Sequence, residues 1–375
     1  EGNGSTQTIT NGIDLAGEGG LVWTKRRDNS QLHGLFDTER GVLKYISSNT
    51  SDAETTASNT LKAFNSDGFQ LGPVSYPVSN QSGEKGVSWT FRKAEKFFDV
   101  VTYAYQGNST GTTAQIPHNL GSTPAFIIIK AVDKAENFIC WHKDLNGYLK
   151  MGTQGTDSLF TATGAFGSLT PSMTDTHFTV GYDGGTNFPG YNYVAYLFAH
   201  NAGGFGDDGD ESIIKCGSFT NSGGSATVSL GWEPQYILAK QTDGADNWFI
   251  ADIMRGLTAG PLTNDNLLNA NDTVVEYTTT RFASPTPDGF IIESMGTSAT
   301  YIYIAIRRPM KTPESGTEVF ATAQRDTTAP IFEGGFPVDA AIIADVSGAW
   351  ANSPSMGSRL TGTGRLATSN SNAEG

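Results

Sequence analysis

LGWEPQYILAKQTD, at residues 230–243, is the clearest copy of a short stretch around which this chain is organised. A glycine and a proline mark a turn, a run of apolar residues follows, and a lysine precedes a second, polar turn. The same order occurs at 120–133 (LGSTPAFIIIKAVD) and, more loosely, at 15–28 (LAGEGGLVWTKRRD) and 334–347 (GGFPVDAAIIADVS). The stretch therefore recurs, and its recurrence predicts how the chain is divided.

The position of the lysine in this stretch gives the period. The marker residues are Lys25, Lys130, Lys240 and, in the fourth place, Ala344. They are spaced by about 105 residues, which is the size of a domain and too long for a solenoid unit. The predicted domains are repeat 1 at 1–95, repeat 2 at 96–204, repeat 3 at 205–312 and a partial repeat 4 at 313–375.

The apolar runs between these markers have the length and composition of strands. They contain four to eight residues, are rich in Val, Ile, Phe, Tyr and Trp, and end at Gly, Asn, Asp or Ser. Nothing shows a sustained helical period. The sequence therefore predicts an all-β fold of tandem β-sandwich repeats, of jelly-roll or immunoglobulin-like size, with little or no helix. Each repeat is expected to be a self-contained pair of sheets, and successive repeats to set the reach of the chain.

The two ends of the sequence differ from this plan. Repeat 1 has no leading strand equivalent to FDVVTYAY at 98–105, and the fourth copy ends before its second half. Two interpretations follow. Either the sequence is a segment of a longer protein, or each end is completed by a strand from another copy.

Charge and composition exclude some classes of partner. The net charge is −14, and a protein that binds nucleic acid or an anionic membrane needs a basic surface. No apolar run approaches the ~18 residues of a membrane-spanning helix. The only cysteines, Cys140 and Cys216, are expected to be buried thiols, with a bridge between repeats as the alternative. No nucleophile elbow, phosphate loop or dinucleotide fingerprint occurs, so the chain is predicted not to be an enzyme and to need no organic cofactor.

One polar motif occurs twice as Asp-x-x-Arg-Gly. The residues concerned are Asp37, Arg40 and Gly41, and again Asp252, Arg255 and Gly256. In repeat 2 we align the motif with the degenerate DLNG at 144–147. We interpret it as a strand-end turn, in which the carboxylate accepts from backbone N–H groups and pairs with the arginine, while glycine takes a positive φ. A carboxylate–guanidinium site for a sugar is the alternative.

Three further features have structural interpretations. Each marker lysine is expected to be a solvated strand end whose stem lies on apolar surface. Asp-Gly-Phe, at 67–69 and 288–290, predicts a turn followed by a core phenylalanine. The five tryptophans considered as sugar-stacking residues are expected mostly to be core residues; they are Trp23, Trp89, Trp232, Trp248 and Trp350.

An acidic loop joins repeats 2 and 3. Its acidic residues are Asp207, Asp208, Asp210 and Glu211. Calcium takes six to eight oxygen ligands, and the loop lacks the spacing of an EF-hand. We therefore expect a flexible, solvated linker, with a calcium site between repeats as the alternative.

The combination of GLVWTKRR, HGLFDTERG, FNSDGFQLG, VSWTFRKAEKFFDVVTY and IPHNLGSTPAFIIIK resembles a tandem domain of structural proteins from marine tailed bacteriophages. These are usually called tail fibre or virion structural proteins. The resemblance covers 8–310 and, more weakly, 317–350. It departs at 138–175, where the Asp-x-x-Arg-Gly turn is missing, and at Ala344. It brings no catalytic or binding residues.

This resemblance implies a virion location and a role in fibre architecture or host attachment. The expected partners are other virion proteins, further copies of the chain, with a trimer favoured, and host surface glycan. Neither nucleic-acid binding nor membrane insertion is expected. The alternatives are a capsid decoration or cement protein, a secreted carbohydrate-binding array and, least favoured, a hydrolase.

Overall fold

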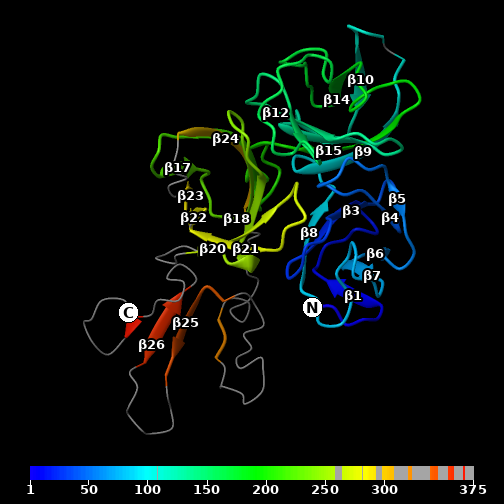
Figure 1. Ribbon diagram of the computed structural model, residues 1–375. Helices are drawn as coiled ribbons and strands as arrows, with labels where there is room; N and C mark the ends of the chain where they lie inside the picture. The colour runs from blue at the N-terminus through cyan, green and yellow to red at the C-terminus, as the bar shows by residue number, and fades with distance from the viewer. Residues whose placement is uncertain are drawn as a thin grey trace.

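The computed structural model describes residues 1–107, 109–257, 264–280, 282–292, 298–307, 320–322, 338–344, 354–358 and 366–367. Across these residues the regular structure consists of β-strands and one short 3-10 turn, η1 (Ile253–Arg255). The all-β prediction is therefore confirmed. The strands fall into three groups, which we call units 1, 2 and 3, and a small separate sheet (Figure 1).

Unit 1 contains two three-stranded sheets, β3-β2-β8 and β1-β7-β6, and the ribbon β4-β5. Its strands are β1 (Gln7–Thr10), β2 (Gly20–Arg26), β3 (Gly34–Asp37), β4 (Lys44–Tyr45), β5 (Thr55–Thr56), β6 (Leu61–Asn65), β7 (Gly68–Leu71) and β8 (Gly86–Arg92).

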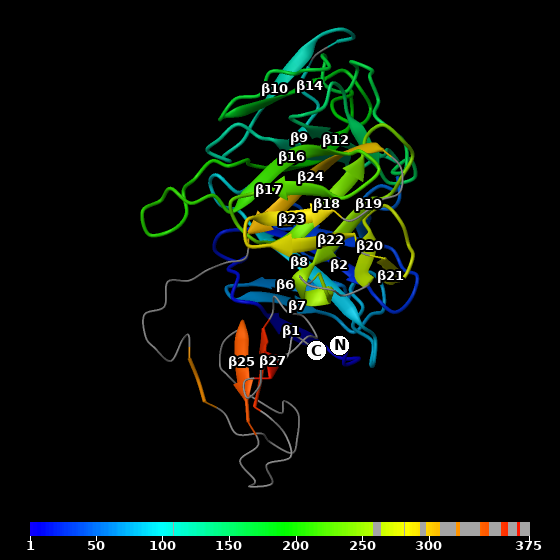
Figure 2. The same ribbon diagram turned by 90° about the vertical axis from the view of Figure 1, so that its left-hand side faces the viewer.

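Unit 2 contains a five-stranded sheet, β13-β12-β11-β15-β9, and the pair β10-β14. Figure 2 shows this pair above the larger sheet. The strands are β9 (Phe98–Ala104), β10 (Thr113–Pro117), β11 (Phe126–Ala131), β12 (Phe138–His142), β13 (Leu149–Met151), β14 (His177–Gly181) and β15 (Asn192–Phe198).

Unit 3 contains a six-stranded sheet, β16-β24-β18-β19-β20-β21, and a three-stranded sheet, β17-β23-β22. Its strands are β16 (Ile214–Asn221), β17 (Ala226–Ser229), β18 (Pro234–Gln241), β19 (Trp248–Asp252), β20 (Asn264–Asn269), β21 (Tyr277–Thr280), β22 (Ala283–Thr286), β23 (Gly289–Ile292) and β24 (Ala299–Arg307). The separate sheet contains β25 (Ala340–Ile343), β26 (Ser355–Ser358) and β27 (Leu366–Ala367).

The same pairing order occurs in all three units. The central strand, β2, β11 or β18, lies between the strand that follows it and the closing strand, β8, β15 or β24. The residue four positions before each marker lysine pairs with the last residue of the following strand. These pairs are Leu21–Asp37, Phe126–His142 and Tyr236–Asp252. The three units therefore share one pairing order and one register around the marker lysine.

The second sheet also follows one scheme. Gly68 and Gly289 each begin a strand after a hairpin turn, and the phenylalanine after each glycine, Phe69 or Phe290, is fully buried. The Asp-Gly-Phe prediction is therefore confirmed. Phe178 takes the same place in unit 2, opposite Ile116.

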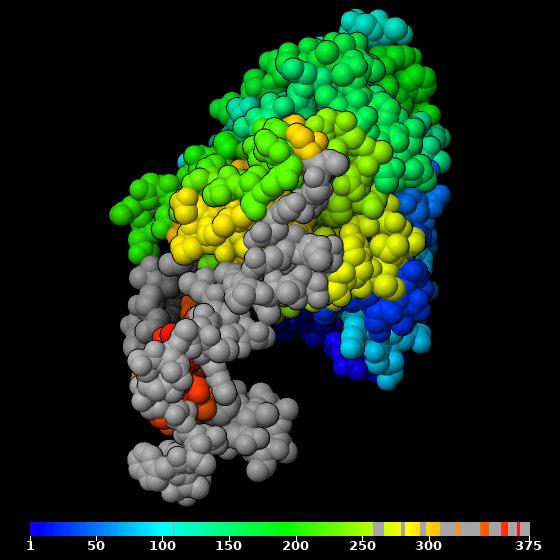
Figure 3. All heavy atoms as spheres, turned by 60° about the vertical axis from the view of Figure 1, so that its left-hand side comes forward, coloured from blue at the N-terminus to red at the C-terminus, as the bar shows by residue number. Residues whose placement is uncertain are grey.

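The three units pack around a common centre, and each contacts the other two (Figures 1 and 3). A single buried apolar cluster includes residues of all three units. At its centre the Phe91 ring lies 5.7 Å from that of Phe198 and 5.9 Å from that of Tyr236, measured between centroids. The expectation of self-contained repeats that follow one another is therefore wrong for units 1 to 3. A sequence period fixes the size of a copy but not how copies pack, and here apolar strand ends from three copies bury one another.

Candidate functional site

The first Asp-x-x-Arg-Gly motif lies at the junction of units 1 and 2. Arg40 donates from its backbone N to Oδ1 of Asp37 at 2.9 Å and from Nε to Oδ2 at 2.6 Å. Gly41 has a φ of 89°. The predicted turn chemistry is therefore present. The turn is buried rather than solvated, because the Tyr196 hydroxyl of unit 2 donates to Oδ2 of Asp37 at 2.8 Å.

The second motif is built in the same way at the junction of units 3 and 1. Arg255 donates to Asp252 from its backbone N at 3.0 Å and from Nε at 2.6 Å. Gly256 has a φ of 112°. The indole Nε1 of Trp89, in unit 1, donates to Oδ2 of Asp252 at 3.0 Å. The guanidinium carbon of Arg255 also lies 5.4 Å from the centre of the Trp89 ring, within cation–π range.

Trp89 and Tyr196 occupy equivalent places in the closing strands. They pair with Trp23 and Ile128, the residues two positions before the marker lysines of their units. Each presents its polar atom to the buried aspartate of another unit. The structure therefore assigns these two residues a shared role that the sequence analysis missed, since no local pattern marks them.

In unit 2 the place of the aspartate belongs to His142. The register pairs His142 with Phe126, just as Asp37 pairs with Leu21. The alignment of DLNG at 144–147 with the motif is therefore wrong by two residues. The alignment failed because it matched Asp144 to the aspartate of the motif. What the units share is the strand register, which is set by burial of one face of the sheet. Leu145 then takes the place of the arginine, and Ile304 that of Trp89 and Tyr196.

A second carboxylate binds each arginine. Arg40 Nη1 lies 3.2 Å from Oε2 of Glu54, and Arg255 Nη1 lies 3.2 Å from Oε2 of Glu276. In unit 2 the corresponding residue is Leu159, which is identified by an equivalent backbone hydrogen bond to the next unit. Two junctions thus contain an aspartate, an arginine, a glutamate and an aromatic residue, and the third has His142, Leu145, Leu159 and Ile304 at the matching places.

Three equivalent backbone hydrogen bonds close the ring of units. Each runs from one of these positions to the carbonyl two residues after a marker lysine in the next unit. They are Glu54 N to Val132 O at 2.7 Å, Leu159 N to Thr242 O at 2.9 Å and Glu276 N to Arg27 O at 2.9 Å. Their order, from unit 1 to 2, from 2 to 3 and from 3 to 1, returns to its start. The units therefore form a closed, pseudo-threefold ring.

The marker lysines are fully buried, so the prediction of solvated strand ends is wrong. Each Nζ donates to the carbonyl of the next residue: Lys25 to Arg26 at 2.9 Å, Lys240 to Gln241 at 2.8 Å, and Lys130 to Ala131. Lys25 also reaches across to the Thr273 carbonyl of unit 3 at 3.2 Å. At Lys25, a loop of unit 3 covers the end of β2, and the sequence of a single repeat does not reveal this contact.

Burial lowers the pKa of all three lysines to about 8, from an ordinary value of 10.5. Nearby carboxylates oppose this shift; they are Asp272 at Lys25, Glu136 at Lys130 and Asp246 at Lys240. The charged form of each lysine is therefore less stable in the folded chain than in water, although each ammonium group makes a hydrogen bond.

The lowered pKa values of the three lysines predict that the free energy of unfolding is larger in mild alkali than at neutral pH. Their pKa values are lower in the folded than in the unfolded chain, so the unfolded chain binds more protons between about pH 8 and 10.5. Stability must then rise as the pH rises through this window. We expect each lysine to add roughly 1–2 kcal/mol to the free energy of unfolding between pH 7.5 and 9.5. Urea unfolding at the two pH values measures this increase, and Lys240→Met should remove the contribution of one lysine. An unchanged pH dependence in Lys240→Met would contradict the assignment.

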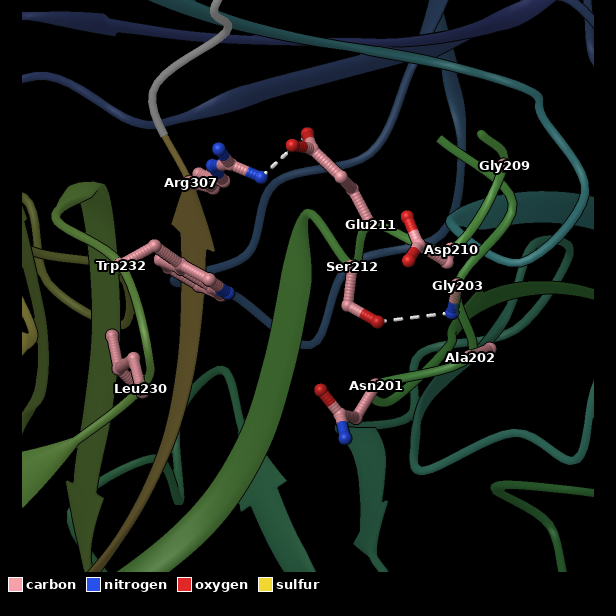
Figure 4. A pocket seen from close by; sticks show the side chains of 10 residues that line it. All are labelled: Asn201, Ala202, Gly203, Gly209, Asp210, Glu211, Ser212, Leu230, Trp232 and Arg307. Atoms are coloured by element: carbon pink, nitrogen blue, oxygen red, sulfur yellow. Dashed lines mark hydrogen bonds and ion pairs between the residues drawn. The ribbon is translucent and has the colours of Figure 1, made fainter. Parts of the chain in front are cut away.

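The acidic loop is exposed to solvent, as expected, and its ends are joined as a hydrogen-bonded hairpin. Phe205 and Glu211 exchange backbone hydrogen bonds of 3.1 and 2.9 Å. The hairpin and Trp232 line opposite sides of an open hollow of about 550 Å³ (Figure 4). Glu211 pairs with Nη1 of Arg307 at 2.7 Å, and both Asp210 and Glu211 are exposed. Within the described residues, no three His, Cys, Asp or Glu side chains gather closely enough to hold a metal ion, and Asp207 and Asp208 lie in that part of the chain.

The remaining candidate residues are in the core. Trp23, Trp89, Trp232 and Trp248 are buried, while Trp350 lies outside the described residues. Cys140 and Cys216 are buried free thiols, so the alternative of a bridge between them is not realised. No helix in the described part of the chain is long and apolar enough to cross a membrane.

No curated protein matches the sequence. The family described as Domain of unknown function (DUF7483) matches residues 1–308. That span ends just after β24, so it coincides with the three units of the ring and stops before β25. The chain belongs to the DUF7483 family.

Proposed function

We propose that this chain is a structural protein of a bacteriophage virion, in a tail or head fibre, with a role in host attachment. The observation that carries the proposal is the place of the recurring polar residues. Asp37, Arg40, Asp252 and Arg255 lie buried in junctions between units, and the marker lysines are buried as well.

These polar residues are the ones from which a catalytic or sugar-binding site would have to be built. A catalytic acid, base or nucleophile has to reach a substrate, and a sugar-binding carboxylate has to face solvent. Here the carboxylates and guanidinium groups bind one another, backbone carbonyls and the aromatic residues of a neighbouring unit. Their contribution is to lock three β-sandwiches into one body. This supports a mechanical role without catalysis, and disfavours the alternative of a sugar site at Asp-x-x-Arg-Gly.

A capsid decoration or cement protein is the second candidate. The ring favours it, because a compact body of three interlocked units covers a patch of surface, whereas a string of separate repeats sets a distance. In either case the partners are other virion proteins and further copies of the chain. Weak contacts with host glycan would gain strength from repeated display.

The test is the location of the chain in purified particles. We expect mass spectrometry to find it in virions, and gold-labelled antibodies to place it on fibres. Labelling over the whole head, with binding to capsids and none to a glycan array, would select the decoration protein. Absence of the chain from purified particles would overturn both candidates. Light scattering of the isolated chain tests the expected trimer.

A further inference from the structure

The hollow beside Trp232 lies where a long link joins unit 2 to unit 3. Residues 93–97 join β8 to β9, whereas residues 199–213 join β15 to β16. In the shorter link, Lys96 N donates to Leu120 O at 2.6 Å, which holds the link against the turn before β11. The longer link instead folds into the acidic hairpin. It leaves an open space of about 550 Å³ between the hairpin and the turn before β18 (Figure 4).

The turn before β18 places a tryptophan at the edge of this hollow. The aligned stretches of units 1 and 2 have Gly17 and Ser122 at the place of Trp232. Trp232 is only 9% exposed, yet its Nε1–H has no hydrogen-bond partner among the described residues. Figure 4 shows the indole nitrogen at the end of the ring that points into the hollow. Three other buried tryptophans donate their indole N–H within the fold; they are Trp23, Trp89 and Trp248. The Trp232 N–H is therefore available to a ligand in the hollow.

The opposite side of the hollow supplies a carboxylate, an amide and a hydroxyl. Asp210 and Asn201 are exposed, and neither side chain hydrogen-bonds to any residue that the structure describes. Ser212 Oγ accepts from Gly203 N at 2.9 Å, so its own proton is still available to donate. Figure 4 shows the three side chains across the hollow from Trp232. Donors and acceptors therefore converge on one space from two segments of the chain.

The charges around the hollow favour a neutral ligand. Arg307 is the only cationic residue that lines it, and Glu211 pairs with this guanidinium at 2.7 Å. Asp210 then leaves the lining with a negative charge, as the whole chain has at −14, and an anionic ligand would be repelled. Leu230 and the Trp232 ring add apolar surface. An indole N–H, a carboxylate, an amide and a hydroxyl beside apolar surface suit the hydroxyl groups and the C–H face of a sugar ring.

We propose that this hollow is a glycan-binding site that takes a neutral sugar residue. Trp232 Nε1 donates to a sugar oxygen, Asp210 accepts from sugar hydroxyls, and the Asn201 amide both donates and accepts. The volume of about 550 Å³ lies within the range of small-molecule sites. The inference rests on the proposed function for the source of the glycan, which is the host surface, whereas the recognition itself uses only groups of this chain.

The test titrates the full, isotope-labelled chain with the methyl glycosides of glucose, galactose, mannose and N-acetylglucosamine, and follows the indole N–H signals by NMR. Trp232→Phe identifies the Trp232 signal by its loss. We expect at least one of these sugars to move that signal and to leave the other indole signals in place. Asp210→Asn, a change at an exposed residue, should weaken the binding by about tenfold. The matched control is Asp208→Asn, because Asp208 is an exposed aspartate of the same hairpin that does not line the hollow.

Each outcome decides for or against the site. A moved Trp232 signal, with binding weakened by Asp210→Asn and unchanged by Asp208→Asn, supports it. Equal binding by the parent chain and Asp210→Asn overturns it, because the sugar then binds elsewhere. A Trp232 signal that none of the four glycosides moves also overturns it, as does tighter binding of methyl glucuronide, which is anionic.

The site and the virion role can fail separately. A chain that binds sugar in the hollow but is missing from purified particles keeps the site and loses the virion role. A chain that is found in particles but binds none of the glycosides keeps the virion role and loses the site.

Discussion

Replacing Asp37 by alanine should lower the free energy of unfolding by about 3–5 kcal/mol. The Arg40 side chain is only 3% exposed and would lose the carboxylate that binds both its Nε and its backbone N. The Tyr196 hydroxyl would lose its acceptor as well. A buried guanidinium without its main partner is the cause of the expected loss, and Glu54, at 3.2 Å, replaces that partner only in part. Urea unfolding of the full chain measures it.

The control uses the chain's own alternative junction. The junction of units 2 and 3 has His142, Leu145, Leu159 and, from unit 3, Ile304 where the first junction has Asp37, Arg40, Glu54 and Tyr196. We expect the fourfold variant Asp37→His, Arg40→Leu, Glu54→Leu, Tyr196→Ile to lose less stability than Asp37→Ala alone, since it leaves no buried charge unpaired; Lys44, which loses Glu54, is exposed. A fourfold variant that loses as much as the sum of the single changes would show that the set does not act as a unit.

The strands and hairpins were accessible from the sequence because their signals are local. Asp-Gly before Phe69 and Phe290 marks a tight turn and then a core residue, and the apolar runs around the lysines mark central strands. Strand type follows from residues within a few positions of one another. The all-β fold could therefore be predicted in full.

The ring could not be predicted, because its contacts join residues at unequal spacings. Glu54 and Glu276 bind Arg40 and Arg255 across 14 and 21 residues of sequence, and no acidic residue stands at the matching place in unit 2. Lys25 looked like a solvated cap because the loop that covers it, at Thr273, belongs to another unit. Side-chain identity thus changes between junctions, while backbone bonds such as Leu159 N to Thr242 O persist.

Trp248→Ala should destabilise the chain by about 3–5 kcal/mol and should loosen the junction of units 2 and 3. The Trp248 side chain is 1% exposed, and its ring centroid lies 5.9 Å from that of Phe126 in unit 2. Its Nε1 donates to the Lys150 carbonyl at 2.9 Å. The variant removes this packing and this hydrogen bond at one contact surface of the ring. Calorimetry measures the loss, and amide exchange at Leu159, whose N–H crosses the same junction, reports the loosening.

The matched control is Trp248→Phe, because unit 2 has Phe138 at the equivalent position, with its ring centroid 5.8 Å from Nζ of the marker lysine Lys130. Phenylalanine keeps most of the buried ring but cannot donate to Lys150, so we expect a loss of about 1–2 kcal/mol. If units 1 to 3 fold as one body through the shared core, both variants should still unfold in a single transition, at lowered temperatures. Separate transitions for the units in the parent chain would mean that each sandwich is stable by itself and that the ring junctions contribute little. In that case the alanine and phenylalanine variants would differ only in the transition of unit 3, and the Leu159 amide would exchange at the same rate in both.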